Sequence, residues 1–339
     1  MGKRKRRKGL GKPTGPMRRP KPAPGYVELP SVQTFYRYQL WTKQSRDLMH
    51  DKSAVLLKPI VWVRDRDNVN RIRSARSVDE LLDLLPLATG LAEATWYKRM
   101  DEVGPEAVPV IVERLRTFKS IPGQEIRDAT LEKLIAVLRW RGEAGGRALL
   151  EVFDALEDYG KSLACVVLGL LGVQESADKL WTFYRRVESR RSETFFVGPL
   201  WGLIDLKDAR AGDALLGLIQ TRRLFCELFP FLSLAGDQRA VIPLAKLATA
   251  LTGDDRGDTL MALIGIGHRI GREALLAELS KAALPGEGAE VLERTVDKVL
   301  TQPAKVVEDH FVTFYRPLSR GDVERGLKGM DTPGSLLGR

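Results

Sequence analysis

The sequence predicts an all-α fold, an α-solenoid of about six stacked helix pairs, from three observations. The first is a short segment that returns: residues 208–216 (DARAGDALL) recur in altered form at 237–244 (DQRAVIPL). The second is that four weaker copies extend the series in both directions, each with an alanine at the equivalent position. These six alanines are Ala107, Ala148, Ala177, Ala211, Ala240 and Ala274. The third is their spacing of 41, 29, 34, 29 and 34 residues, near the period of repeats built from two helices.

Each copy of the segment fits the second helix of a pair. We expect Asp237 to cap the start of such a helix, because its carboxylate can accept a hydrogen bond from a backbone N–H that lacks a partner within the helix. The helix before it, expected at about 224–234, is apolar on nearly every side, as is typical of a helix held between neighbours. Since a pair must bury its face against the next pair, several repeats are needed, and six units fill about 74–283.

Two copies also carry a family likeness. Residues 236–244 (GDQRAVIPL) and 104–109 (GPEAVP) resemble HEAT-like repeats of the type named after phycobilisome bilin lyases. The resemblance implies the solenoid fold but no single function, since such repeats occur in lyases, scaffolds, adaptors and nucleic-acid binders. No residue marks a site for attaching a tetrapyrrole, so we do not expect lyase activity.

Residues 1–24 form the first of four predicted parts, a disordered basic tail. The chain has 54 Lys and Arg against 44 Asp and Glu, and the whole excess lies in this tail, which has no acidic residue. Its glycines and prolines and its very few apolar residues predict disorder when it is free. Its ten basic residues are Lys3, Arg4, Lys5, Arg6, Arg7, Lys8, Lys12, Arg18, Arg19 and Lys21.

Four roles are open to this tail. Nonspecific binding of RNA or DNA phosphate is the one that we favour, and it would depend strongly on salt. Docking on an anionic membrane, nuclear import in a eukaryotic source, and simple solubilisation are the others. No hydrophobic anchor accompanies the tail, so we expect no stable membrane insertion.

The second predicted part is the aromatic-rich segment 25–73, and the fourth is the C-terminal segment 284–339. The segment 25–73 contains the densest aromatic run of the chain, at 32–41, and a stretch at 55–63 that we expect to be extended or a short strand. We expect it to cover the outer apolar face of the first repeat, although its aromatic and arginine residues would also suit a nucleic-acid platform. The segment 284–339 is expected to supply capping helices at about 291–300 and 306–315, followed by a flexible end.

A possible basic rim lies at the ends of the second helices. Equivalent positions of a solenoid line up along one edge, so these side chains would come together. Their alternative role is local, since a cation near a helix C-terminus interacts favourably with the helix dipole. The arginines are Arg114, Arg116, Arg185, Arg186, Arg190, Arg191, Arg222 and Arg223, and Lys119 accompanies the first two.

No catalytic motif, metal site or cofactor site is evident. His50, His268 and His310 lack neighbouring ligands at metal spacing. Solenoid DNA glycosylases use an Asp with Trp residues, and Trp201 lies near Asp205 and Asp208, but nothing matches that family residue by residue. We expect these residues, like Trp140 and Trp181, to pack or to cap helices.

The sequence therefore favours a non-enzymatic binding or scaffold protein in a reducing, cytoplasmic compartment. Cys165 and Cys226 are too few, and too deep in apolar runs, for a disulfide framework. The solenoid would hold a protein partner while the tail contacts RNA or DNA, and no small-molecule substrate is evident. The alternatives are a solenoid enzyme acting on nucleic acid and a pure protein–protein adaptor.

Overall fold

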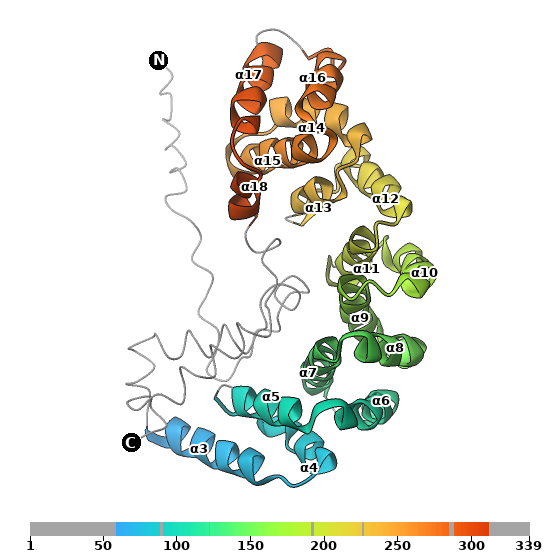
Figure 1. Ribbon diagram of the computed structural model, residues 1–339, viewed down its shortest axis with the longest axis vertical. Coiled ribbons are helices and arrows are strands. Elements are labelled where there is room, and N and C mark those ends of the chain that lie inside the picture. Colours follow the sequence, from blue (N-terminus) through green and yellow to red (C-terminus); the bar gives the residue numbers. More distant parts are fainter. Residues whose placement is uncertain are drawn as a thin grey trace, which may run out of the picture.

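A computed structural model describes residues 59–88, 91–121, 123–190, 193–225, 227–284 and 288–311 of the chain. The all-α prediction is confirmed for these residues, which form helices and turns and no strand. The helices follow one another in a curved array that is open on one side (Figure 1). The predicted basic tail, Arg191, Cys226 and the C-terminal end from 312 lie outside the described residues.

The α-helices come in chain order, separated by short connections. The odd-numbered ones are α3 (Pro59–Ser74), α5 (Leu91–Val103), α7 (Gln124–Trp140), α9 (Asp158–Leu170), α11 (Glu193–Asp205), α13 (Leu228–Ala235), α15 (Gly253–Ile270) and α17 (Gly288–Leu300). The even-numbered ones are α4 (Val78–Asp83), α6 (Ala107–Thr117), α8 (Gly142–Val152), α10 (Ala177–Val187), α12 (Ala209–Gln220), α14 (Val241–Ala250), α16 (Arg272–Ser280) and α18 (Lys305–His310). Single 3-10 turns include η4 (Phe118–Ser120), η5 (Phe153–Ala155) and η7 (Gln238–Ala240).

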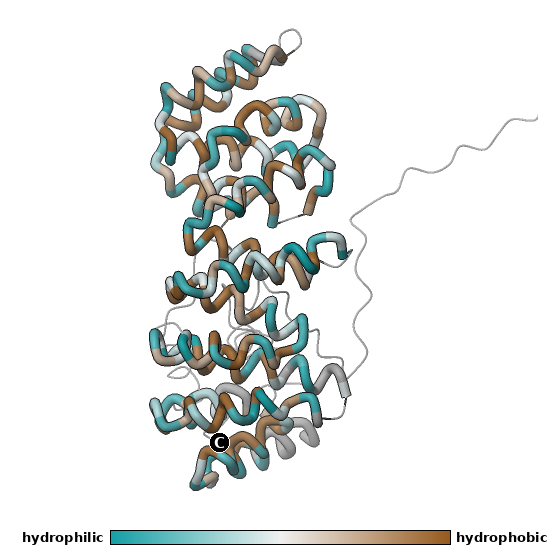
Figure 2. Tube along the Cα trace, turned by 90° about the vertical axis from the view of Figure 1, so that its right-hand side faces the viewer, coloured by the Kyte–Doolittle hydropathy of each residue, from teal (hydrophilic) through white to brown (hydrophobic). Residues whose placement is uncertain are grey.

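Two rows of helices run along the array. Helices α5, α7, α9, α11 and α13 lie on its inner side, and α6, α8, α10 and α12 lie on its outer side (Figure 1). Each inner helix packs against the next one along the row. Figure 2 shows hydrophobic and hydrophilic residues alternating along the helices, as expected when one side of each helix packs on its neighbours.

The repeat alanines of the sequence mark the even-numbered helices. Ala107 and Ala177 are the first residues of α6 and α10, and Ala240 directly precedes α14. Ala148, Ala211 and Ala274 lie within α8, α12 and α16. Each repeat alanine therefore lies at the start of a helix or within one.

The expectation of an extended segment at 55–63 is wrong for the part that is described, because α3 begins at Pro59. Proline is well placed in the first turn of a helix, where its missing N–H has no intrahelical partner in any case. Helix α3 then packs on α5 and buries Val69 and Ile72. The β-branched residues that suggested a strand are outweighed by this packing.

The helix expected at 224–234 begins later, at Leu228. Phe225 lies in the preceding turn yet is buried, with its ring 5.3 Å from Phe196 and 6.4 Å from Phe231. Pro230 is then the third residue of α13, within the first turn, where proline is tolerated. The prediction that this apolar run lies in the core is confirmed, but the prediction that it forms one continuous helix is wrong.

Helices α9 and α11 approach one another backbone to backbone at the middle of the array. A Cβ atom built on Gly202 would lie 2.3 Å from the carbonyl oxygen of Cys165, and one on Gly198 would lie 2.1 Å from that of Ser162. A Cβ on Gly169 would lie 2.4 Å from the Cα of Gly202. Only glycine fits at these positions, so they fix how closely the two inner helices pack.

Candidate functional site: the Asp–Arg motifs and a basic patch

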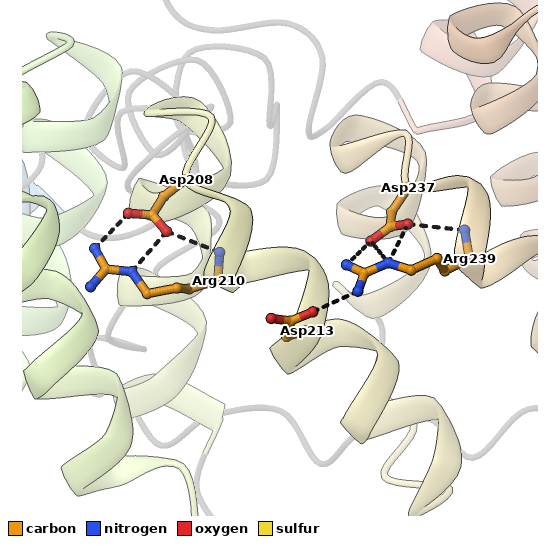
Figure 3. A network of polar contacts seen from close by, with 5 residues as sticks. All are labelled: Asp208, Arg210, Asp213, Asp237 and Arg239. Atoms are coloured by element: carbon orange, nitrogen blue, oxygen red, sulfur yellow. Dashed lines mark hydrogen bonds and ion pairs between the residues drawn. The ribbon is translucent and has the colours of Figure 1, made fainter.

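The two strong copies of the repeat build the same polar arrangement, shown in Figure 3. Asp208 accepts a hydrogen bond from the backbone N–H of Arg210 at 3.0 Å and pairs with its guanidinium through Nη2 at 2.6 Å. Asp237 does the same with Arg239, at 2.9 Å and 2.6 Å. The expected cap by Asp237 is thus confirmed, with a charge-assisted pair added to it.

Each of these arginines also reaches the preceding even-numbered helix. The Nη1 atom of Arg210 is 2.8 Å from Asp178 of α10, and that of Arg239 is 2.8 Å from Asp213 of α12. The motif therefore caps one helix and ties it to its neighbour.

The charge state of the motif follows from this pairing. The hydrogen bonds from the neighbouring guanidinium hold the pKa of Asp208 and that of Asp237 below their ordinary value. The same pairing raises the pKa of Arg210 and Arg239. Carboxylates held in this way are poor proton acceptors, which suits a structural role better than general-base catalysis.

The tryptophans considered for an enzymatic groove occupy three separate packing positions. Trp201 is completely buried, with its ring 5.0 Å from Phe231. Trp140 packs on Tyr97 at 5.2 Å, and Trp181 stacks on Tyr184 at 5.5 Å. They do not form one constellation around a carboxylate.

His310 and the buried Cys165 also occupy separate positions, and His50 lies outside the described residues. His310 lies 2.7 Å from Asp258 through Nε2, and this contact joins α18 to α15. Among the described residues, no group of three His, Cys, Asp or Glu side chains is arranged to hold a metal ion. Cys165 is a free, buried thiol, and burial raises its pKa well above the ordinary value.

The arginines of the predicted basic rim fall into two groups. Arg114 of α6 pairs with Asp83 at 2.8 Å, and Arg116 pairs with Glu113 at 3.3 Å and also contacts Glu151 of α8. These contacts tie the first outer helices together and occupy both arginines. Arg222 is exposed in the turn after α12 and has a left-handed backbone with φ 52°.

The second group gathers at the end of α10. Arg186 and Arg190 both pair with Asp158 at the start of α9, and Arg185 pairs with Glu188 at 2.8 Å. Arg223, from the turn after α12, donates to the backbone carbonyls of Glu188 and Arg190. This region therefore joins two successive helix pairs.

Lys119 of the predicted rim and Lys161, which was not part of it, complete this region. Burial lowers the pKa of Lys161 in α9, and the nearby charges of Arg186 and Lys119 lower it further. We call this set the basic patch, and its members are Lys119, Lys161, Arg185, Arg186, Arg190 and Arg223. The signal in the sequence that could have indicated Lys161 is its position shortly after the connection at 153–157.

Phenylalanine rings lie beneath most cations of the basic patch. The guanidinium carbon is 5.1 Å from the ring of Phe183 for Arg186, 4.8 Å from Phe195 for Arg190, and 4.1 Å from Phe196 for Arg223. The Lys161 ammonium is 5.8 Å from the ring of Phe153. These cation–π contacts hold the charged groups in defined positions.

Comparison with known proteins gives no functional assignment, so the interpretation rests on the geometry described above. No protein-family model, curated protein or solved structure matches the chain. Within the part of the chain that the structure describes, no helix has the length and apolar character needed to cross a bilayer.

Proposed function

We propose that this protein is a non-enzymatic scaffold, a HEAT-like α-solenoid that holds a protein partner on its folded array while its basic N-terminal residues contact RNA or DNA phosphate. The observation that carries the proposal is the curved double row of helices, in which each helix pair touches mainly its neighbours. Such arrays present long continuous surfaces, a property suited to holding another macromolecule.

The Asp–Arg motifs support this proposal over the enzymatic alternative. Asp208 is the carboxylate that a groove enzyme would need, and its side chain is only 14% exposed and is engaged by Arg210. Trp201, the aromatic side chain nearest to it in sequence, is completely buried. Both residues serve the packing of the array, so we propose a binding role in which substitutions act through stability.

The test compares the full-length protein with a full-length variant in which the six basic residues at 3–8 are glutamine. Each is recovered from a native extract, with and without nuclease treatment, and bound proteins are identified and then re-bound as purified components. We expect the wild type to carry nucleic acid and the variant to carry far less, while both retain the same protein partner. Nucleic acid recovered equally with both would contradict the role of the tail. Failure to recover any reproducible protein partner with either protein would contradict the scaffold role.

A further inference from the structure

The basic patch has more positive charge than its surroundings neutralise. Its six cations face Asp154, Asp158 and Glu188, and Asp154 already pairs with Lys179. Asp158 is shared by two arginines. Lys119 and Lys161 form no ion pair among the described residues. Positive charge is thus gathered here at an electrostatic cost.

The charged groups of the basic patch are nevertheless held in place and open to solvent. Backbone carbonyls fix Arg223, and rings lie under Arg186 and Arg190. The side chains of Arg185, Arg186 and Arg190 are 59%, 53% and 41% exposed. An anion could therefore reach ordered guanidinium groups with little further loss of side-chain entropy.

The composition of the basic patch favours phosphate over carboxylate ligands on an acidic protein. Four of its six cations are arginines, whose planar guanidinium matches a phosphate group in two parallel hydrogen bonds. Phe195 is half-buried with the Arg190 guanidinium over its ring at 4.8 Å, so a base could stack on this guanidinium or on the part of the ring that stays exposed. Phosphate contacts combined with aromatic stacking are typical of sites for single-stranded nucleic acid.

We propose that the basic patch, which lies where the start of α9 meets the end of α10 in the middle of the array, binds the backbone of single-stranded RNA or DNA, with a base stacked near Phe195. The site shares its ligand class with the proposed function but lies on the folded array, apart from the tail. It would let the scaffold hold a strand against its surface, whereas the tail alone would only tether it.

The test uses full-length protein and a fluorescein-labelled single-stranded uridine oligonucleotide, with affinity measured by fluorescence anisotropy over a range of salt concentrations. The patch variant carries Lys119→Gln, Lys161→Gln and Arg185→Gln. The control variant makes the same charge change at remote exposed positions, with Lys246→Gln, Arg256→Gln and Lys298→Gln. Circular dichroism and the unfolding midpoint verify that both remain folded.

We expect the patch variant to lose about three phosphate contacts, which lowers the slope of log affinity against log salt by about 2. If the wild type and the patch variant bind equally at 1 M salt, this difference in slope makes the variant bind about 50-fold more weakly near physiological salt. The control variant should bind like the wild type apart from a small general charge effect. Equal affinity and slope in the patch and control variants would overturn the proposal.

A second variant, Phe195→Ala, separates stacking from charge. We expect about fivefold weaker binding or more with an unchanged salt slope, because a stacked base is lost and no phosphate contact is. Preference for duplex over single strands, or patch-dependent binding of phosphatidylserine vesicles without oligonucleotide binding, would overturn the assignment. Affinity that falls with the patch variant and not with the glutamine variant of residues 3–8 would support this site and reject the tail's role. The reverse result would reject this site alone.

Discussion

The close approach of α9 and α11 predicts a large penalty for a single methyl group. In Gly202→Ala the new Cβ would lie 2.3 Å from the Cys165 carbonyl oxygen and 2.7 Å from Leu180 Cδ2. An ordinary carbon–oxygen contact is about 3.3 Å, so the two helices would have to separate by about 1 Å. Overpacking of this kind costs up to about 3 kcal/mol, and a backbone neighbour cannot rotate away. Alanine returns about 1 kcal/mol of helix propensity, so we expect a net loss of about 2 kcal/mol in the free energy of unfolding.

The matched control is Gly217→Ala in α12, where nothing lies within 4 Å of the new Cβ. There the helix propensity acts alone, and stability should rise by up to about 1 kcal/mol. Urea unfolding followed by far-UV circular dichroism measures both variants against the wild type. Opposite shifts of the two midpoints are expected. A Gly202→Ala protein that unfolds at or above the wild-type midpoint would refute the backbone-to-backbone packing of the two inner helices.

Three further predictions concern single polar or thiol groups. Asp237→Ala should lower stability by about 1 kcal/mol at neutral pH through loss of the cap. Because the folded pKa of Asp237 lies below its ordinary value of 3.8, its stabilisation is present above pH 4 and lost as the pH falls through the folded pKa. The urea midpoints of wild type and variant should therefore converge in acid, and a gap that persists there would contradict the charge-assisted cap. In a Cys226→Ser protein, the buried Cys165 should react with a disulfide reagent only at the rate of unfolding. Rapid reaction in native buffer would show that the thiol is accessible. Tyr159→Phe removes the hydroxyl that donates to the buried Glu132 carboxylate and should cost about 1–3 kcal/mol in calorimetry, whereas a neutral result would show that this contact is not formed.

The second helices of the pairs could be predicted from sequence because their signals are local. In the two strong copies, a capping carboxylate, an arginine two residues later and a buried alanine recur together. In the second copy Asp237 caps, Arg239 pairs with the neighbouring helix and Ala240 packs in the core. Local signals of this kind do not depend on distant parts of the chain.

The start of α3 and the start of α13 could not be predicted in the same way. The β-branched residues after Pro59 and the aromatic run before Leu228 each fit two local structures, and long-range packing decides between them. About half of the predicted basic rim does come together in the structure. The sequence did not show that Arg114 and Arg116 are paired elsewhere, or that Lys161 and Phe195 complete the remaining group, because these contacts join residues far apart in the chain.

The most direct test of the binding account is ultraviolet crosslinking of the full-length protein to single-stranded RNA that contains 4-thiouridine, with crosslinked peptides identified by mass spectrometry. The account predicts crosslinks in two places, within residues 1–24 and within 183–196, where Phe195 and three arginines of the basic patch lie. Crosslinks confined to the Asp–Arg motifs near Asp208 and Asp237, or an absence of crosslinks at saturating RNA, would contradict it.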